Sequence, residues 1–251
     1  MLPFPQLPRR SFLTLLGTAA VALAACRHPL LADEEASPPP VDRHPELERL
    51  APAEEVWIDL PAKRVVVGGL VVLDEGPLEF FACPRHTKEH ESIVAVNASA
   101  RLVHAALLAI GLEPGKPVSF DPEYAAASGP ALRLTMRWKD AAGGAHEADA
   151  RSWVRETRTG KELATDWVFA GSGLWTDADG REHYQADAGD FISVSNFPTA
   201  TLDLPIESSQ SNEALLFDVF PGRVPPVGTV LDIVITRAVP ARPASAPPAG
   251  R

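Results

Sequence analysis

The sequence is poor in cysteine and in positive charge, and it has no long apolar run. Its only cysteines are Cys26 and Cys83, so at most one intrachain disulfide could form. Lys and Arg number 23 against 33 Asp and Glu, and the formal net charge is -10. This balance argues against a surface that binds the phosphate backbone of nucleic acids. With 251 residues, of which 45% are apolar, the chain can still bury one sizeable core.

The first 25 residues have the order of a bacterial signal peptide. Arg9 and Arg10 follow a short proline-containing start, and a weakly apolar run then extends over residues 12–25. As a helix, a run of this length rises about 21 Å, which is short of the roughly 30 Å hydrocarbon core of a bilayer. The stretch Arg9–Leu13 resembles the twin-arginine export motif, although the usual flanking residues differ. An ordinary secretion signal is the alternative.

The stretch Leu23-Ala24-Ala25-Cys26 resembles the lipobox of bacterial lipoproteins, in which the cysteine becomes the acylated N-terminus. We therefore expect a signal peptide over residues 1–25 and lipid attachment at Cys26, with ordinary cleavage after Ala32 as the alternative. Each buried methylene adds about 0.8 kcal/mol to membrane binding. The acyl chains would thus hold the protein on the extracytoplasmic side of the inner or the outer membrane. Acylation of Cys26 would leave Cys83 without an intrachain partner.

Both ends of the expected mature chain have the composition of disordered segments. Residues 26–53 contain Pro38-Pro39-Pro40 and scattered acids without apolar periodicity, which predicts a lipid-anchored tether. Residues 239–251 consist almost wholly of Ala, Pro, Arg and Ser, which predicts a disordered tail. One folded domain is expected between them, over residues 54–238.

Strand patterns dominate this domain. Apolar and polar side chains alternate over Leu132–Trp138, and turn sequences at 141–144 and 177–180 predict two hairpins. One convincing helix covers about residues 98–110, with a capping residue at its start and a glycine after its end. The sequence therefore predicts a β-rich α+β fold in which this helix packs on a curved antiparallel sheet. A sandwich or a partly closed barrel fits the same pattern.

Seven short motifs, in order, resemble the YdjY domain family of exported bacterial proteins. The motifs are Leu78–Cys83, Thr87–Ile93, His104–Gly111, Gly115–Val118, Trp167–Ser172, Tyr184–Asp187 and Pro225–Thr229. Together they cover nearly all of residues 55–236. The resemblance implies an exported domain with these boundaries, and it implies no particular reaction.

The densest set of chemically versatile side chains lies between residues 83 and 104. The candidate ligand-binding residues are Cys83, Lys88, His90, Glu91 and His104. Thiolate and imidazole are donors that zinc accepts, but the metal-binding patterns HExxH and CxxC are missing. We therefore assign no cofactor, and keep a bound metal as an open alternative. Lys88, His90 and Glu91 would equally suit an anionic or carbonyl ligand, or a proton transfer.

Three functions from different classes are compatible with these observations. We favour an exported, lipid-anchored envelope protein whose domain is a non-catalytic binding module for an envelope protein or a small ligand, because no complete catalytic motif is present. The first alternative is a metal- or thiol-dependent enzyme centred on Cys83, His90, Glu91 and His104. The second is a structural scaffold of the envelope. The spatial separation of the candidate side chains distinguishes these functions.

Overall fold

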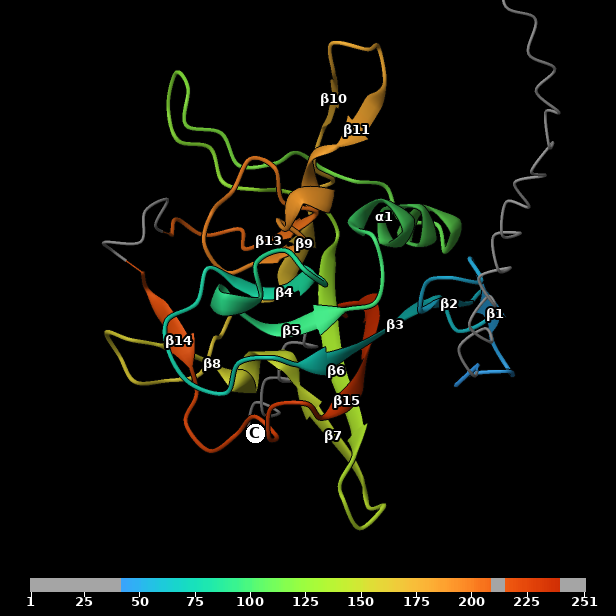
Figure 1. Cartoon of the computed structure of the whole chain (residues 1–251). Helices are drawn as coiled ribbons and strands as arrows, with labels where there is room; N and C mark the ends of the chain where they lie inside the picture. Colours follow the sequence, from blue (N-terminus) through green and yellow to red (C-terminus); the bar gives the residue numbers. More distant parts are fainter. Residues whose placement is uncertain (1–41, 209–214, 240–251) are drawn as a thin grey trace, which may run out of the picture. The chain divides into compact units, whose positions relative to one another are not determined.

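The computed structural model describes residues 42–208 and 215–239 (Figure 1). The predicted signal peptide, Cys26, and most of the predicted tether and tail lie outside the described residues. The strands are β1 (Glu48–Arg49), β2 (Val56–Asp59), β3 (Arg64–Val71), β4 (Phe80–Pro84), β5 (Ser92–Val96), β6 (Ala131–Lys139), β7 (Ala145–Asp149), β8 (Val154–Glu156), β9 (Trp167–Phe169), β10 (Leu174–Thr176), β11 (Glu182–Tyr184), β12 (Ile192–Ser193), β13 (Leu202–Asp203), β14 (Phe217–Val219) and β15 (Val230–Arg237). The helices are α1 (Ala100–Ala109) and the short 3₁₀ helices η1 (Glu89–Glu91), η2 (Ala150–Trp153) and η3 (Gln185–Ala188).

Eight strands close into a mixed β-barrel. Their order is β3-β15-β6-β9-β13-β12-β4-β5, and β5 pairs back with β3 to complete the circle. Within this circle, β4 is parallel to β5 and β12 is parallel to β13. All other adjacent strands of the barrel are antiparallel. The β-rich α+β prediction is confirmed. The barrel is closed all the way round, and its parallel pairs are a feature that the expected antiparallel sheet did not include.

Alternating side chains of the long strands fill the barrel. Leu132, Leu134 and Met136 of β6 are all buried in the main core, as their alternation with polar residues predicts. The ring of Phe81 packs between those of Trp153 and Trp167, at centroid distances of 6.3 and 5.4 Å. These large rings close the interior, so the barrel is a packed core and not a channel.

The predicted helix is confirmed as α1. Ser99 is its N-cap, and the Ser99 hydroxyl accepts a hydrogen bond from the backbone N–H of Leu102. Gly111 follows the helix with φ +86°, a conformation that favours glycine. Val103 and Leu107 lie on the buried face of α1, which packs against β2, β3 and η3. Tertiary packing of this apolar face holds a short helix that would be marginal alone.

Residues 42–53, which the sequence places within the tether, are packed against the barrel. Strand β1 pairs with β2, and Trp57 Nε1 donates a hydrogen bond of 2.8 Å to Asp42 Oδ1. Arg43 forms ion pairs with Glu55 and with Asp232 of β15, at 3.1 and 2.8 Å. These contacts are polar and join distant residues, so they leave no apolar periodicity in the sequence.

Both predicted hairpins are present, and both leave the barrel. Strand β7 pairs with β6 alone, whereas β10 and β11 form a separate two-stranded sheet. Figure 1 shows the β6–β7 and β10–β11 hairpins extending in opposite directions from the barrel.

Candidate functional site

Cys83 lies in the barrel wall and is closed to solvent. It is on β4, with its thiol beside the hydroxyl groups of Thr87 and Ser92. Burial raises the pKa of the Cys83 thiol, which opposes formation of the reactive thiolate. Cys83 therefore has the surroundings of a small packed residue.

Lys88 is held between a carboxylate and two aromatic rings. Its Nζ lies 2.7 Å from Asp190 Oδ1, and it stands over the rings of Phe80 and Phe197, at 4.4 and 5.0 Å from their centroids. Asp190 also accepts a hydrogen bond from the hydroxyl of Thr199. The charge of Lys88 is thus compensated within the protein. The contacts tie the connection between β4 and β5 to the segment before β12.

The carboxyl groups of Glu79 and Glu91 lie near each other and near this lysine. Burial, followed by the charge of Glu91, raises the pKa of Glu79, so Glu79 holds its proton to a higher pH than an exposed glutamate does. His90 points the other way: its side chain is 78% exposed, and its Nε2 lies 3.7 Å from Glu91 Oε2. The fold therefore gathers Lys88 and Glu91 around Glu79 and leaves His90 at the surface.

His104 has a different set of partners. Its Nδ1 lies 2.8 Å from Tyr184 Oη, and its ring packs edge-on against Phe169 at a centroid distance of 4.9 Å. Burial lowers the pKa of His104 and raises that of Tyr184 to about 12. Tyr184 donates a 3.0 Å hydrogen bond to the carbonyl of Gly171. Both rings are therefore uncharged at neutral pH.

A series of polar contacts connects Lys88 with His104. The backbone N–H of Thr201 donates to the carbonyl of Asp190 at 3.1 Å, and Thr201 Oγ1 lies 3.1 Å from Tyr184 Oη. We call these five residues, Lys88, Asp190, Thr201, Tyr184 and His104, the polar seam. Each of them is engaged with another protein group, so the seam fixes the segment between η3 and β13 against the barrel.

A buried acid that the sequence analysis did not identify lies at the end of this segment. Asp203 is wholly buried on β13, and burial raises its pKa to about 7. Its Oδ1 accepts hydrogen bonds from the Leu204 N–H at 2.7 Å and from Asn196 Nδ2 at 3.4 Å. Its Oδ2 has no hydrogen-bond partner among the described residues. In the sequence, the only indication that this acid is buried is its position between Leu202 and Leu204 in an apolar stretch.

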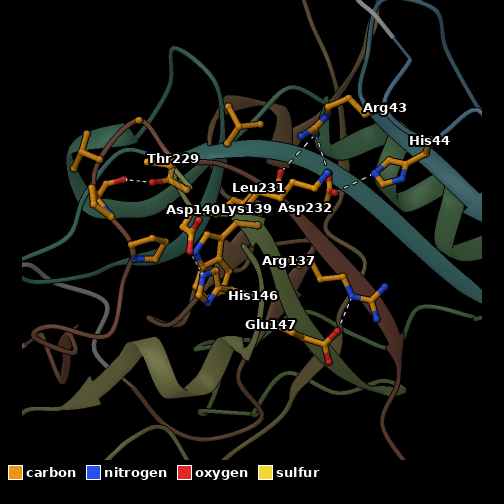
Figure 2. A pocket seen from close by; sticks show the side chains of 18 residues that line it. Arg43, His44, Arg137, Lys139, Asp140, His146, Glu147, Thr229, Leu231 and Asp232 are labelled. Carbon is orange, nitrogen blue, oxygen red and sulfur yellow. Dashed lines mark hydrogen bonds and ion pairs between the residues drawn. The ribbon is translucent and has the colours of Figure 1, made fainter. Parts of the chain in front are cut away.

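A cavity of about 1340 Å³ lies elsewhere, beside the β6–β7 hairpin (Figure 2). It is bordered by the start of β15, by the loop before β15 and by the segment that precedes β1. None of the five predicted site residues lines this cavity. Its principal side chains are Arg43, Trp138, Lys139, His146, Val227 and Val230. They come from three distant parts of the chain, so no single local motif contains all of them.

Most charged groups around the cavity are paired with one another, as Figure 2 shows for Arg137 and Glu147. Arg137 Nε lies 2.7 Å from Glu147 Oε2. Asp140 Oδ2 lies 2.7 Å from His146 Nε2. Lys139 has no ion-pair partner among the described residues, and Val230, which also lines the cavity, is 57% exposed. The cavity thus combines apolar surface with one uncompensated ammonium group.

A metal-dependent site needs several ligand side chains close together. Within residues 42–208 and 215–239, no three His, Cys, Asp or Glu side chains are placed to hold a metal ion. Over the same residues, no helix has the length and apolarity needed to cross a bilayer. Ser172 lies in a turn with φ +52°, and its hydroxyl donates to the carbonyl of Thr199 at 2.5 Å.

Over residues 42–208 and 215–239, the barrel, the helix α1 and the polar seam define the class of protein, a closed and mixed β-barrel domain with one α-helix in this part of the chain. The family model of the YdjY domain matches residues 56–236, and the chain belongs to this family. No curated protein and no solved structure is detectably similar to it.

Proposed function

We propose that this chain is an exported, lipid-anchored envelope protein whose YdjY domain is a non-catalytic binding module. The observation that supports binding over catalysis is the dispersal of the candidate reactive groups. Cys83 is buried, His90 faces solvent, and His104 is engaged with Tyr184. The open cavity lies apart from all three residues. This arrangement supplies a surface for a ligand without assembling a nucleophile and its base.

The cavity beside the β6–β7 hairpin is the proposed binding surface. It offers exposed apolar side chains, an aromatic ring and the ammonium group of Lys139, which together suit a ligand with an apolar part and polar groups. The segment that carries Arg43 forms one wall, and it directly follows residues 26–41, the part of the proposed tether that lies outside the described residues. If Cys26 is acylated, residues 26–41 span at most about 55 Å, so the binding surface would stay near the membrane.

Replacing Cys26 tests the anchor. We expect the wild-type chain to be found in the membrane fraction, with a mass that shows three acyl chains on Cys26. The Cys26→Ser variant should be soluble in the periplasm, while the control Cys83→Ser should remain in the membrane. Recovery of wild-type chain in the cytoplasm with residues 1–25 attached would contradict the export and the anchor together.

The binding role is tested at the cavity itself. The mature protein is immobilised and exposed to fractionated envelope components, and any retained ligand is then tested against Val230→Glu. The control is Leu108→Glu, which adds the same charge at an exposed apolar position of α1, away from the cavity. We expect binding to be lost in Val230→Glu and retained in Leu108→Glu. Equal binding by both variants would place the ligand elsewhere, and no retained ligand would contradict the binding role.

A further inference from the structure

The two protruding hairpins carry the same sequence pattern at their tips. Residues 138–146 and 175–183 both read Trp-x-Asp-Ala-x-Gly-x-x-His. We call residues 138–146 tip 1 and residues 175–183 tip 2. The two stretches are otherwise different, since only the Trp, Asp, Ala, Gly and His positions coincide.

The shared residues of tip 1 form one compact unit. Trp138 and His146 are cross-strand partners, and their rings stack with centroids 5.3 Å apart and planes 16° from parallel. Asp140 Oδ2 lies 2.7 Å from His146 Nε2, while Asp140 Oδ1 accepts hydrogen bonds from the N–H groups of Ala142 and Gly144. Tip 1 also forms part of the cavity wall described above.

Tip 2 repeats this unit atom for atom. Trp175 and His183 are cross-strand partners, and their rings stack at 4.7 Å and 23°. Asp177 Oδ2 lies 2.6 Å from His183 Nε2, and Asp177 Oδ1 accepts hydrogen bonds from the N–H groups of Asp179 and Arg181. In each tip the hydrogen bond from the histidine is the main cause of the lowered pKa of the aspartate.

Turn formation accounts for only part of the pattern. The aspartates accept from turn amides, and Gly143 and Gly180 have φ +84° and +80°, so these positions are explained by the turn. The turn does not require a tryptophan and a histidine. Trp138 is half-buried, and its ring packs edge-on against that of Trp153 at a centroid distance of 5.5 Å, so core packing accounts for part of its presence. Trp175 has no such role, since it is 49% exposed on a hairpin that pairs with no other strand.

The chemistry common to both tips is an aromatic platform with a fixed hydrogen-bond acceptor. Because Nε2 of each histidine faces a carboxylate, the neutral imidazole carries its proton there and Nδ1 becomes an acceptor. Nδ1 of His146 and of His183 has no hydrogen-bond partner among the described residues. The platform is therefore suited to a flat, partly apolar ring that bears hydroxyl donors.

The charged residues of tip 1 differ from those of tip 2, and this difference limits the class of ligand that both tips could bind. Tip 1 contains Lys139 where tip 2 has Thr176, and tip 2 adds Asp179, Arg181 and Glu182. A ligand recognised by its charge would not suit both tips, whereas a neutral ring would. We propose that the two tips are equivalent binding elements for neutral pyranose rings of a glycan. The tryptophan stacks on the apolar face of the sugar and the histidine Nδ1 accepts from a hydroxyl.

The tips are too far apart to hold one sugar. Tip 1 includes the C-terminal end of β6, whereas β9, which leads to tip 2, pairs with the first residues of β6 at Ala131 and Leu132. Strand β6 has nine residues and a length of about 30 Å. The hairpins also point in opposite directions in Figure 1. The chain therefore bridges two glycan strands, or two distant points of one strand, and binds with avidity.

The test uses the full mature chain with Cys26→Ser, so that the protein is soluble without a lipid. The probes are purified peptidoglycan sacculi and microcrystalline cellulose, two insoluble polymers of pyranose rings from different sources. Co-sedimentation gives the affinity, and capture of fluorescently labelled soluble fragments of the same polymer by the sedimented protein reports bridging. The variants are Trp138→Leu, Trp175→Leu and the double variant. The control is Leu174→Thr, which alters an exposed neighbour outside the pattern. Urea midpoints identify any variant that has lost its fold.

We expect binding to at least one polymer, and the polymer that binds identifies the source of the glycan. Each single variant should lower the apparent affinity at least about tenfold and abolish bridging. The double variant should not bind, and Leu174→Thr should behave as wild type. Binding to neither polymer, or binding that is unaffected by the double variant, would overturn the proposal. Dependence on only one tip would overturn the equivalence and the bridging. The inference deepens the proposed binding role, which survives if a ligand binds the cavity independently of both tips.

Discussion

Replacing Asp203 with asparagine is expected to stabilise the protein at neutral and alkaline pH, but not in acid. Asp203 is buried on β13, and burial raises its pKa to about 7 from an ordinary value of 3.8. An interval of about 3 between the folded and unfolded pKa values corresponds to about 4 kcal/mol of lost stability once the carboxyl is ionised in both states.

The direction in which stability changes with pH follows from proton binding. Between about pH 4 and pH 7, the folded protein holds a proton on Asp203 that the unfolded chain has released. Stability therefore falls as the pH rises through this interval and stays constant above it. Asparagine cannot ionise, and it keeps the acceptor for the Leu204 N–H. Its new N–H donors cost about 1–3 kcal/mol if they stay unpaired. The expected net gain at pH 8 is therefore about 1–3 kcal/mol, with no gain at pH 4.

Urea unfolding of the wild type and Asp203→Asn at several pH values between 4 and 8 measures this difference. The matched control is Asp149→Asn. Burial alone would raise the pKa of Asp149, but hydrogen bonds from Arg151 lower it, so its loss should destabilise most at high pH. The reasoning is refuted if Asp203→Asn is no more stable than the wild type at pH 8, or if the difference between them does not change with pH.

Three further predictions concern the sequence-derived site. Lys88→Met should destabilise the protein by about 1–3 kcal/mol, because it leaves the Asp190 carboxylate with only the Thr199 hydroxyl as a partner. In urea unfolding, adding Asp190→Asn should recover part of this loss. An unchanged stability of Lys88→Met would contradict the role of the ion pair. Cys83 should resist iodoacetamide at pH 8 in the native protein and react completely in concentrated urea, as mass spectrometry would show; rapid native labelling would contradict its burial. Elemental analysis of the purified chain should find less than about one tenth of an equivalent of zinc, iron or copper, and a full equivalent would return the metal-dependent alternative.

The elements that the sequence predicts are those whose signal is local. Strand β6 alternates over nine residues, α1 has a cap and an apolar face, and the tip turns contain aspartate and glycine at the required positions. Barrel closure has no such signal, because β12 and β13 are only two residues long and pair with each other at a single position, Ile192 with Leu202. The parallel pairing of β4 with β5 is equally hidden. Only residues 85–91 connect these strands, a length more typical of a hairpin.

The candidate site was predictable in part for the same reason. Lys88 and Glu91 are close in sequence and lie together, but the partner of Lys88 is Asp190, which only the fold brings to it. Residue type alone cannot distinguish an exposed His90 from a half-buried His104. The repeat of the hairpin tips was visible in the sequence, and direct alignment of the two turn regions would have revealed it.

The packing of residues 42–44 has a mechanical consequence for a protein held by its amino terminus. In a chain anchored through Cys26 as proposed, tension along residues 26–41 would reach the barrel through the contacts of Asp42 with Trp57 and of Arg43 with Asp232. Asp232 belongs to a strand with a neighbour on each side. The force would then act on several strands of the barrel at once, in shear. It would not act first on β1 at the edge of the sheet. A domain attached in this way can be pulled without first being unravelled.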